Sequence, residues 1–323
     1  MIQDTIARGE GWLKPSQQWV VTNQVQAKQA RAQLPELPTE NVLIEPCGRN
    51  TAPCIGLAAI HILHRDPDGV MLVMPADHVI RPNEKFREAA QRAAAVVAQQ
   101  PETFVLFGVV PTYPSTGFGY IQRTEETQGS YKMSYLVRTW REEPHETTAS
   151  SYLKAGSYYW NCGIFVWRAR AILDALKEYE PEMYAGLVKI ADSLGKPDEQ
   201  DVLHREFPKL NSISVDYAVL ERSPNTTVIE APFEWDDLGS WYALPRLLGQ
   251  DDNQNTIDGP HVGLQTRGCI IRTDDNHLVA TIGLEDCIVV HTPDATLVAR
   301  RDDENAVKQL VALIEERGYG RFL

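Results

Sequence analysis

The sequence predicts an α/β protein with a doubly wound, mostly parallel sheet, followed by a smaller β-rich domain. Short apolar, β-rich runs alternate with helical patterns up to about residue 111. The composition then shifts to Asp, Asn, Gln and Gly at residues 249–260, which predicts a loop or linker before a set of short strands. With 323 residues, 43% of them hydrophobic, the chain is long enough to bury one large core or two unequal ones.

Strands and helices are expected to alternate in the first part of the chain. Apolar runs bounded by turn residues predict strands at 18–23, 41–46, 69–78 and 104–111. Helical patterns fill the intervals and predict helices at 24–34, 51–65 and 83–100. This rhythm is typical of βαβ units and so of a parallel sheet.

The pattern changes after residue 111, where turn residues dominate. A strand is expected within 131–144, and an apolar strand at 160–167 leads into a helix at 168–179. The last part predicts five short strands and a closing helix, at 262–266, 269–273, 278–283, 287–292, 295–300 and 303–316. The expected domains are therefore 1–248 and 256–323, and no internal repeat of fixed period is evident.

Charge and cysteine content limit the partners and the compartment. The formal net charge of −13 argues against a nucleic-acid polymer or an anionic membrane as partner, because both would repel the chain. A small phosphorylated ligand stays compatible, since local basic groups and a metal offset a global charge. Five scattered cysteines indicate neither a disulfide framework nor a zinc site. With no run of membrane-span length and no signal peptide, we expect a soluble, cytoplasmic protein.

Asp77 follows the buried strand in "VMLVMPADHVI". Ligands of open α/β sheets bind beyond the carboxyl ends of such strands, so this position suits a binding site. Asp is also a favoured turn and cap residue, and position alone leaves both roles open.

Several separated motifs resemble the mannose-1-phosphate guanylyltransferases, the GDP-mannose pyrophosphorylases. The motifs, in chain order, are "ELPTENVLIEPCGRNTAPCIGLAA", "VMPADHVI", "FGVVPTYPSTGFGYI", "WNCGIFVWRA", "SVDYAVLE" and "WDDLGSW". The resemblance runs over nearly the whole chain and implies a sugar nucleotidyltransferase (Rossmann-like) fold with a β-helix-like tail. It also implies transfer of GMP from GTP to mannose 1-phosphate, which yields GDP-mannose and pyrophosphate. A homodimer is expected by the same similarity.

The resemblance implies a divalent metal site for Mg²⁺. Attack of one phosphate on another faces charge repulsion, and Mg²⁺ prefers one or two carboxylates together with phosphate oxygens and water. By similarity the metal carboxylates, and so the catalytic residues, are Asp77 and Asp237, the second Asp of "WDDLG". Asp236 is the alternative ligand, and either of these two is also suited to the turn before Gly239.

The resemblance assigns the nucleotide to "EPCGRNTAP". Glu45 looks like the carboxylate that accepts from guanine N1–H and N2–H₂, with Asn50, Thr51 and Ala52 lining the same pocket. The same segment is also a plausible helix start, with Asn50 or Thr51 as N-cap and Pro53 in the first turn.

The sugar hydroxyls have their own set of residues by similarity. The set comprises Gly119, Tyr120, Glu142, Asn161 and Asp216. Glycine lets backbone approach a ligand closely, although "TGFGYI" alone reads equally well as an ordinary turn. Polar groups placed to pair one sugar's hydroxyls reject sugars that leave them unpaired.

For four other residues the sequence favours a structural role over a chemical one. His61 and His64 share a helix face without a third ligand, and His78 suits a turn contact beside Asp77. Cys162 is assigned to packing, because this chemistry needs no covalent nucleophile.

Two departures from the family pattern put activity in question. The sequence given lacks the family's first strand and Gly-rich triphosphate loop, so 1–248 is expected to be a truncated nucleotidyltransferase domain. Glu143 of "REEP" stands where the family has a lysine for the sugar phosphate. Two hypotheses follow: a guanylyltransferase, or a catalytically impaired homologue that acts as a nucleotide-sugar-binding or regulatory subunit.

Overall fold

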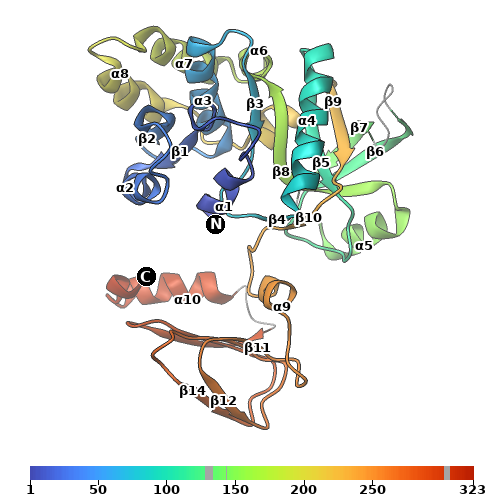
Figure 1. Ribbon diagram of the computed structural model, residues 1–323, viewed down its shortest axis with the longest axis vertical. Coiled ribbons are helices and arrows are strands. Elements are labelled where there is room, and N and C mark those ends of the chain that lie inside the picture. Colours follow the sequence, from blue (N-terminus) through green and yellow to red (C-terminus); the bar gives the residue numbers. More distant parts are fainter. Residues whose placement is uncertain (128–133, 143, 302–305) are drawn as a thin grey trace. The chain divides into compact units, whose positions relative to one another are not determined.

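The computed structural model describes residues 1–127, 134–142, 144–301 and 306–323 (Figure 1). By their internal contacts these residues form two compact units, Met1–Trp235 and Asp236–Leu323. The sequence domains expected at 1–248 and 256–323 stay a prediction.

The helices and strands follow the order that the periodicity predicts, with additions that include strands at 79–81 and 120–127 and helices at 146–155, 181–193 and 199–206. The helices are α1 (Ile2–Ala7), α2 (Gln24–Gln33), α3 (Thr51–Arg65), α4 (Asn83–Gln99), α5 (Glu146–Ala155), α6 (Ala169–Tyr179), α7 (Pro181–Ser193), α8 (Glu199–Glu206), α9 (Ala243–Leu248) and α10 (Ala306–Glu316). The strands of the first unit are β1 (Val20–Asn23), β2 (Val42–Glu45), β3 (Val70–Val73), β4 (Val79–Arg81), β5 (Phe104–Val109), β6 (Tyr120–Thr127), β7 (Ser134–Arg141), β8 (Tyr158–Arg168) and β9 (Thr226–Glu230), with β10 (Glu234–Asp236) at its end.

The central sheet of the first unit has six strands in the order β3-β8-β5-β9-β7-β6, with an extra pairing of β6 to β8. The expected mixture of helices and a sheet is confirmed, but its mostly parallel character is wrong. Among the described pairings of this sheet, only β5 with β9 is parallel. The reason is β8, which enters between β3 and β5 and runs antiparallel to both. A strand buried on both faces has the same apolar pattern in either direction, so the sequence did not reveal this.

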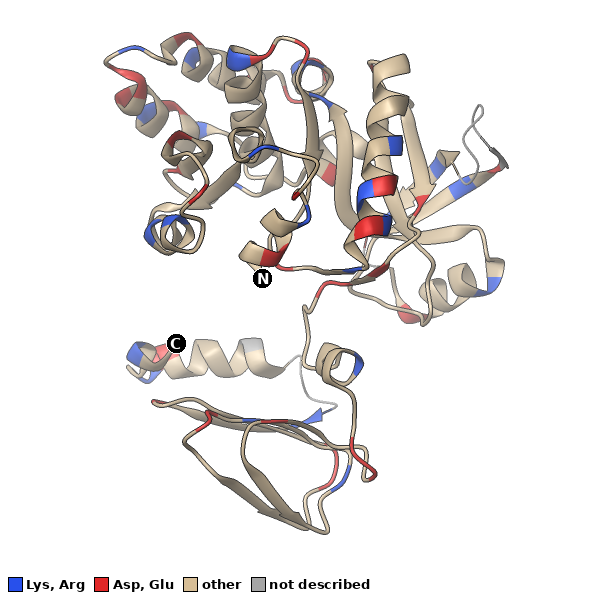
Figure 2. Ribbon diagram, viewed as in Figure 1, with Lys and Arg blue, Asp and Glu red and all other residues tan. Residues whose placement is uncertain are grey.

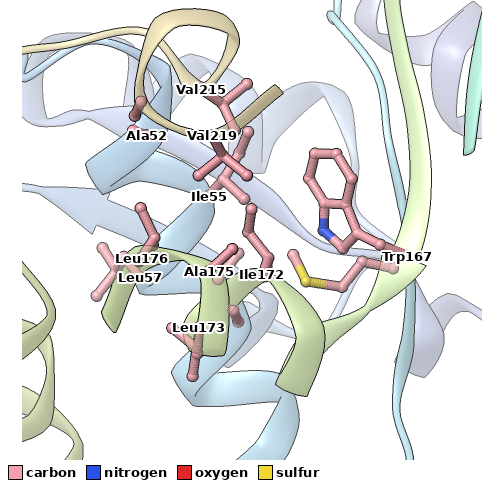
Figure 3. Packing of buried hydrophobic residues seen from close by; sticks show 14 of the residues in the cluster. Ala52, Ile55, Leu57, Trp167, Ile172, Leu173, Ala175, Leu176, Val215 and Val219 are labelled. Carbon is pink, nitrogen blue, oxygen red and sulfur yellow. The ribbon is translucent and has the colours of Figure 1, made fainter. Parts of the chain in front are cut away.

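Alternate residues of the central strands pack into two separate layers of core. In β5, Phe104 and Leu106 belong to the layer under α3, α6 and α7, whereas Val105 and Phe107 face α4. This period of two is what a strand covered on both faces requires. Figure 3 shows the first layer, in which Trp167 of β8 packs near side chains of α3 and α6. The central strands carry almost no charged residues, which lie mainly on helices and loops (Figure 2).

The second unit is a stack of short parallel strands. Its strands are β11 (Thr256–Asp258), β12 (His261–Leu264), β13 (Ile270–Arg272), β14 (Val279–Ile282), β15 (Cys287–His291) and β16 (Thr296–Arg300). The strands β11, β13 and β15 pair in parallel, as do β12 and β14, and β16 adds to β15 antiparallel. This arrangement agrees with the β-helix-like tail that the sequence predicts.

Parallel pairings join the successive coils of this unit. His261 pairs with Val279 and Ile270 pairs with Ile288, eighteen positions apart in both cases, whereas Thr256 pairs with Ile270, fourteen positions apart. The offset between paired residues is therefore not constant, and the expectation of no fixed sequence period stays a prediction.

Among the described residues, none of the helices has the length and apolar character needed to cross a membrane.

Gly108 of β5 is expected to tolerate no side chain. A Cβ there would lie 2.6 Å from Tyr159 Cβ and 2.7 Å from Val228 Cγ2, both in neighbouring strands. We expect Gly108→Ala to lower the free energy of unfolding by about 1–3 kcal/mol, measured by urea denaturation, because the core would be overpacked. Gly48→Ala is the control, since nothing lies within 4 Å of its added Cβ. Equal midpoints for both variants would contradict this packing.

Candidate functional site

Asp77 lies on the turn between β3 and β4, with its side chain 74% exposed. The neighbouring His78 is anchored, because Trp235 donates from Nε1 to His78 Nδ1 at 3.0 Å. Gly163 of β8 supports the same turn. Its φ of +68° is in the left-handed region, and an added Cβ would lie 3.3 Å from Pro75 Cγ. The turn is held firmly while its carboxylate faces solvent.

Helix α1 braces this turn through a buried arginine. Arg8 is only 3% exposed, and it donates from Nη2 to the carbonyl of His78 at 2.7 Å. Arg8 also donates to Thr5 Oγ1 at 2.8 Å, and Thr5 Oγ1 donates to the carbonyl of Ala76 at 3.2 Å. Burial lowers the pKa of Arg8, although a guanidinium stays charged in proteins. Sequence reasoning missed this pair, since one arginine and one threonine on a short helix carry no pattern.

Glu45 ends β2 with a carboxylate oxygen in need of a donor. Its Oε2 is buried and has no hydrogen-bond partner among the described residues. Burial raises the pKa of Glu45. The nearby Cys54 thiol has its pKa raised to about 12, first by burial and then by the charge of Glu45. A ligand that donates hydrogen bonds to Glu45 would remove the cost of this unpaired acceptor.

The start of α3 follows directly, and it is the helix start that the sequence also suggested. Asn50 is the N-cap, at a φ of 66°, and its Oδ1 accepts from Thr51 N–H at 2.8 Å. Thr51 Oγ1 accepts from the backbone N–H of Val215 at 2.8 Å, and Ala52 N–H donates to the carbonyl of Ile213 at 3.1 Å. These bonds place the predicted nucleotide segment beside the segment that carries Asp216.

Four of the five predicted sugar residues lie together. Asn161 of β8 donates from Nδ2 to Asp216 Oδ1 at 3.0 Å, and its backbone N–H donates to the carbonyl of Gly119 at 2.8 Å. Gly119 has no room for a side chain, because an added Cβ would overlap the carboxylate of Glu142. Trp140 Nε1 donates to Glu142 Oε1 at 2.5 Å, and burial raises the pKa of Asp216. The result is a polar cluster of two carboxylates, one amide and the buried backbone of Gly119.

Tyr120 is placed differently from the other four. Its side chain is fully buried, and its hydroxyl donates to the carbonyl of Ser115 at 2.9 Å. It packs in a cluster with Ala149 and Trp160. The ring therefore fixes the Gly-rich turn, and Tyr120 is a core residue with no exposed surface, contrary to its assignment to the sugar set.

Asp237 belongs to the second unit, and its pairing with Asp77 stays a prediction. The alternative ligand, Asp236, is already engaged. Its Oδ2 accepts from Arg246 Nε at 2.5 Å and its Oδ1 accepts from Leu238 N–H at 3.0 Å. These contacts favour Asp237 over Asp236 as a metal carboxylate. Glu143 lies outside the described residues.

The other residues assigned to structural roles also have clear contacts. The pKa of His61 is lowered to about 4, chiefly by burial, and its ring centroid lies 6.3 Å from that of Trp19. Cys162 is buried and donates from Sγ to the carbonyl of Phe107 at 3.2 Å. Both residues pack within the first unit.

The first unit is an α/β fold that carries a cluster of polar groups, and comparisons with known proteins show its family. The family model described as nucleotidyl transferase matches residues 1–253, and the MannoseP isomerase/GMP-like beta-helix domain matches residues 259–313. The chain belongs to the nucleotidyl transferase family. Its curated relatives include mannose-1-phosphate guanylyltransferases, which confirms the resemblance seen in the sequence.

One such relative is the mannose-1-phosphate guanylyltransferase of Escherichia coli K12, 37% identical over 98% of this chain and 67% of its own. Another is the alginate biosynthesis protein AlgA of Pseudomonas syringae pv. tomato, 37% identical over 87% of this chain. The chain spans 58% of the length of AlgA.

Solved structures agree with the fold. A structure titled mannose-1-phosphate geranyltransferase, from Thermus thermophilus, superposes with a TM-score of 0.85 at 28% identity, covering 97% of this chain and 89% of that chain. A mannose-6-phosphate isomerase from Helicobacter pylori has a TM-score of 0.60 at 24% identity over 73% of this chain and 90% of its own, which shows a shared fold only.

Replacing Glu45 tests the cost of its buried charge. Because the pKa of Glu45 is higher in the folded than in the unfolded protein, the folded state binds more protons between the two values. The native protein should therefore lose stability as pH rises through that window. Glu45→Gln should not lose stability in that window, because an amide does not titrate there. It should melt at a higher temperature than the native protein at neutral pH, and at no higher temperature in acid.

The matched control for this experiment is Glu102→Gln, on the exposed turn before β5. Parallel profiles of melting temperature against pH for the native protein and Glu45→Gln would refute the assigned cost.

Proposed function

We propose that this protein transfers GMP from GTP to mannose 1-phosphate, giving GDP-mannose and pyrophosphate, with Mg²⁺ and in the cytoplasm as a homodimer. The observation that carries the proposal is the polar cluster of Gly119, Glu142, Asn161 and Asp216, which hydrogen bonds connect to the start of α3. Gly163, two residues beyond Asn161, packs against the turn of Asp77. The predicted sugar, nucleotide and metal residues of the first unit thus share one region.

In this proposal the cluster recognises the sugar. Asp216 and Glu142 offer acceptors to hydroxyl donors, and Asn161 offers both an acceptor and donors. Because Gly119 has no side chain, the Glu142 carboxylate can lie directly against the Gly119 backbone. A sugar with a hydroxyl in the wrong position would leave one of these buried groups unpaired, which disfavours it.

The guanine base is assigned to Glu45. Guanine carries adjacent donors at N1 and N2, and a carboxylate with an unpartnered buried oxygen is a suitable acceptor for them. Donated hydrogen bonds would favour the charged form of Glu45 and so offset the burial that raises its pKa. Asn50, Thr51 and Ala52 would line the pocket through the first turn of α3.

The residues fit Mg²⁺ held jointly with the substrate phosphates. Asp77 offers an exposed carboxylate on a braced turn, and Mg²⁺ is usually bound by one or two carboxylates plus phosphate oxygens and water. In the part of the chain that the structure describes, no group of three or more His, Cys, Asp and Glu could hold a metal alone. In this proposal Asp77 is a ligand of the ion, whose charge offsets the repulsion between the reacting phosphates, and Asp237 stays the second candidate ligand.

Asp77→Asn tests the metal assignment. We expect it to lower Mg²⁺-dependent release of pyrophosphate from GTP and mannose 1-phosphate on the order of 100-fold or more, because the metal supplies several kcal/mol. Asp237→Asn should behave alike. The control is Asp174→Asn, at an exposed position of α6. Full activity of Asp77→Asn, with its fold intact by circular dichroism, would exclude Asp77 as a metal ligand.

The sequence favours one second candidate, a catalytically impaired relative that binds nucleotide sugar or regulates a partner. Its basis is Glu143, a carboxylate where similar enzymes have a lysine for the sugar phosphate. A like charge beside a phosphate weakens binding, most of all in a dry site.

Glu143→Lys separates the two candidates. If Glu143 faces the sugar phosphate, the variant should bind mannose 1-phosphate at least about tenfold more tightly by calorimetry, and the gain should shrink as salt rises. Glu146→Lys, at an exposed position of α5, controls for the general change in charge. Equal gains in both variants would show that the position is not specific.

A further inference from the structure

Two cysteines stand opposite each other in successive coils of the second unit. The parallel pairing of β13 with β15 matches Ile270 to Ile288, and an earlier bridge matches Arg267 to Glu285. The same offset brings Cys269 opposite Cys287. Neighbouring strands lie about 4.8 Å apart, and disulfides join Cα atoms about 4.4–6.8 Å apart. Backbone spacing therefore permits a bond between these two residues.

Both side chains point into the same cluster. Cys269 is buried there with Ile271 and Val289, and Cys287 packs against this cluster. The sulfur of Cys269 also lies 3.6 Å from the carbonyl oxygen of Leu284, so that sulfur already lies against the next coil. Each thiol also donates to a carbonyl of its own coil, Cys269 to Arg267 at 3.3 Å and Cys287 to Glu285 at 3.2 Å. Neither hydrogen bond is strong enough to prevent a change of rotamer.

The two cysteines differ in access. Cys269 is 0% exposed, and burial raises its pKa, whereas Cys287 is half-buried. A reagent in solution therefore meets Cys287 first. Cys269 is placed to react second, from within the stack.

We propose that Cys269 and Cys287 are a reversible redox pair, which closes to a disulfide when a peroxide oxidises the protein. The Cys287 thiol first loses its proton, and the thiolate attacks a peroxide oxygen. The O–O bond breaks, the departing hydroxide takes up the proton that Cys287 lost and becomes water, and Cys287 is left as a sulfenic acid. The Cys269 sulfur then attacks Cys287 sulfur and the S–O bond breaks. The Cys269 proton joins the leaving hydroxide to form a second water. Two thiols lose two electrons, and hydrogen peroxide is reduced to two waters.

The bond would join the coil of β13 to the coil of β15. A cross-link of this kind stabilises mainly by restricting the unfolded chain. The other free cysteines, Cys47, Cys54 and Cys162, belong to the first unit. The proposal thus predicts one cross-link, confined to the second unit and removed by a dithiol reductant.

The test treats the reduced full-length chain with hydrogen peroxide, blocks the remaining thiols by alkylation, and maps the peptides by mass spectrometry without reduction. The expected product is one cross-linked peptide pair containing Cys269 and Cys287, lighter than the two thiol peptides by the mass of H₂. Oxidation should also raise the melting temperature by several degrees, and dithiothreitol should reverse both changes.

Two variants make the test decisive. Cys287→Ser should remove the cross-link and the shift in melting temperature, and Cys47→Ser should keep both. If Cys287→Ser does not fold, brief alkylation of the native protein supplies the same test, since Cys287 should react before Cys269. A cross-link between other cysteines, or oxidation of Cys287 to sulfinic acid without any cross-link, would overturn the proposal.

Discussion

Asn161 holds together the parts from which the candidate site is built. Its side-chain amide donates to Asp216 and accepts from the backbone N–H of Gly163, while its own backbone N–H donates to Gly119. One residue of β8 therefore connects the Gly-rich turn before β6 with the segment after α8. It can do so because β8 lies in the middle of the sheet, between β3 and β5. Because Asn161 is part of a paired strand, the groups that it bonds are held in fixed positions relative to the sheet.

The turn of Asp77 depends on the same strand in a different way. A carboxylate that faces solvent has no packing of its own to hold it, so its backbone must be fixed by neighbours. Gly163 supports the turn on one side, and Arg8 and Thr5 bind its carbonyls on the other. These residues are positioning residues, since their contacts are to the turn and not to the carboxylate.

The sequence was informative where burial sets a simple period. The strand β5 and the helix α4 lie where their apolar patterns predict, because each buries whole faces. The meeting of the residues assigned to the sugar could be anticipated only through resemblance, since nothing in the spacing of Gly119, Asn161 and Asp216 shows that they lie together. The antiparallel direction of β8 could not be predicted from the sequence, because a strand buried on both faces has the same apolar pattern in a parallel and in an antiparallel sheet.

The bracing of the candidate site was also invisible in the sequence. Arg8 looks like an ordinary charged residue of a short terminal helix, yet it is buried and lies against residues seventy positions away. Tyr120 shows the opposite error, because a residue predicted to bind the sugar proves to be core. Long-range contacts of single residues follow from the folded topology, and a local pattern does not encode them.

The direction of β16 limits growth of the stack in the second unit. A parallel coil leaves an open edge that offers its hydrogen bonds to any further strand of the same direction, including one from another molecule. The antiparallel β16 occupies that edge on β15 and replaces it with a different pattern of donors and acceptors. With Arg300 at its end, the covering strand ends the series of coils. At this edge of the sheet the unit thereby presents an antiparallel strand in place of a further parallel coil.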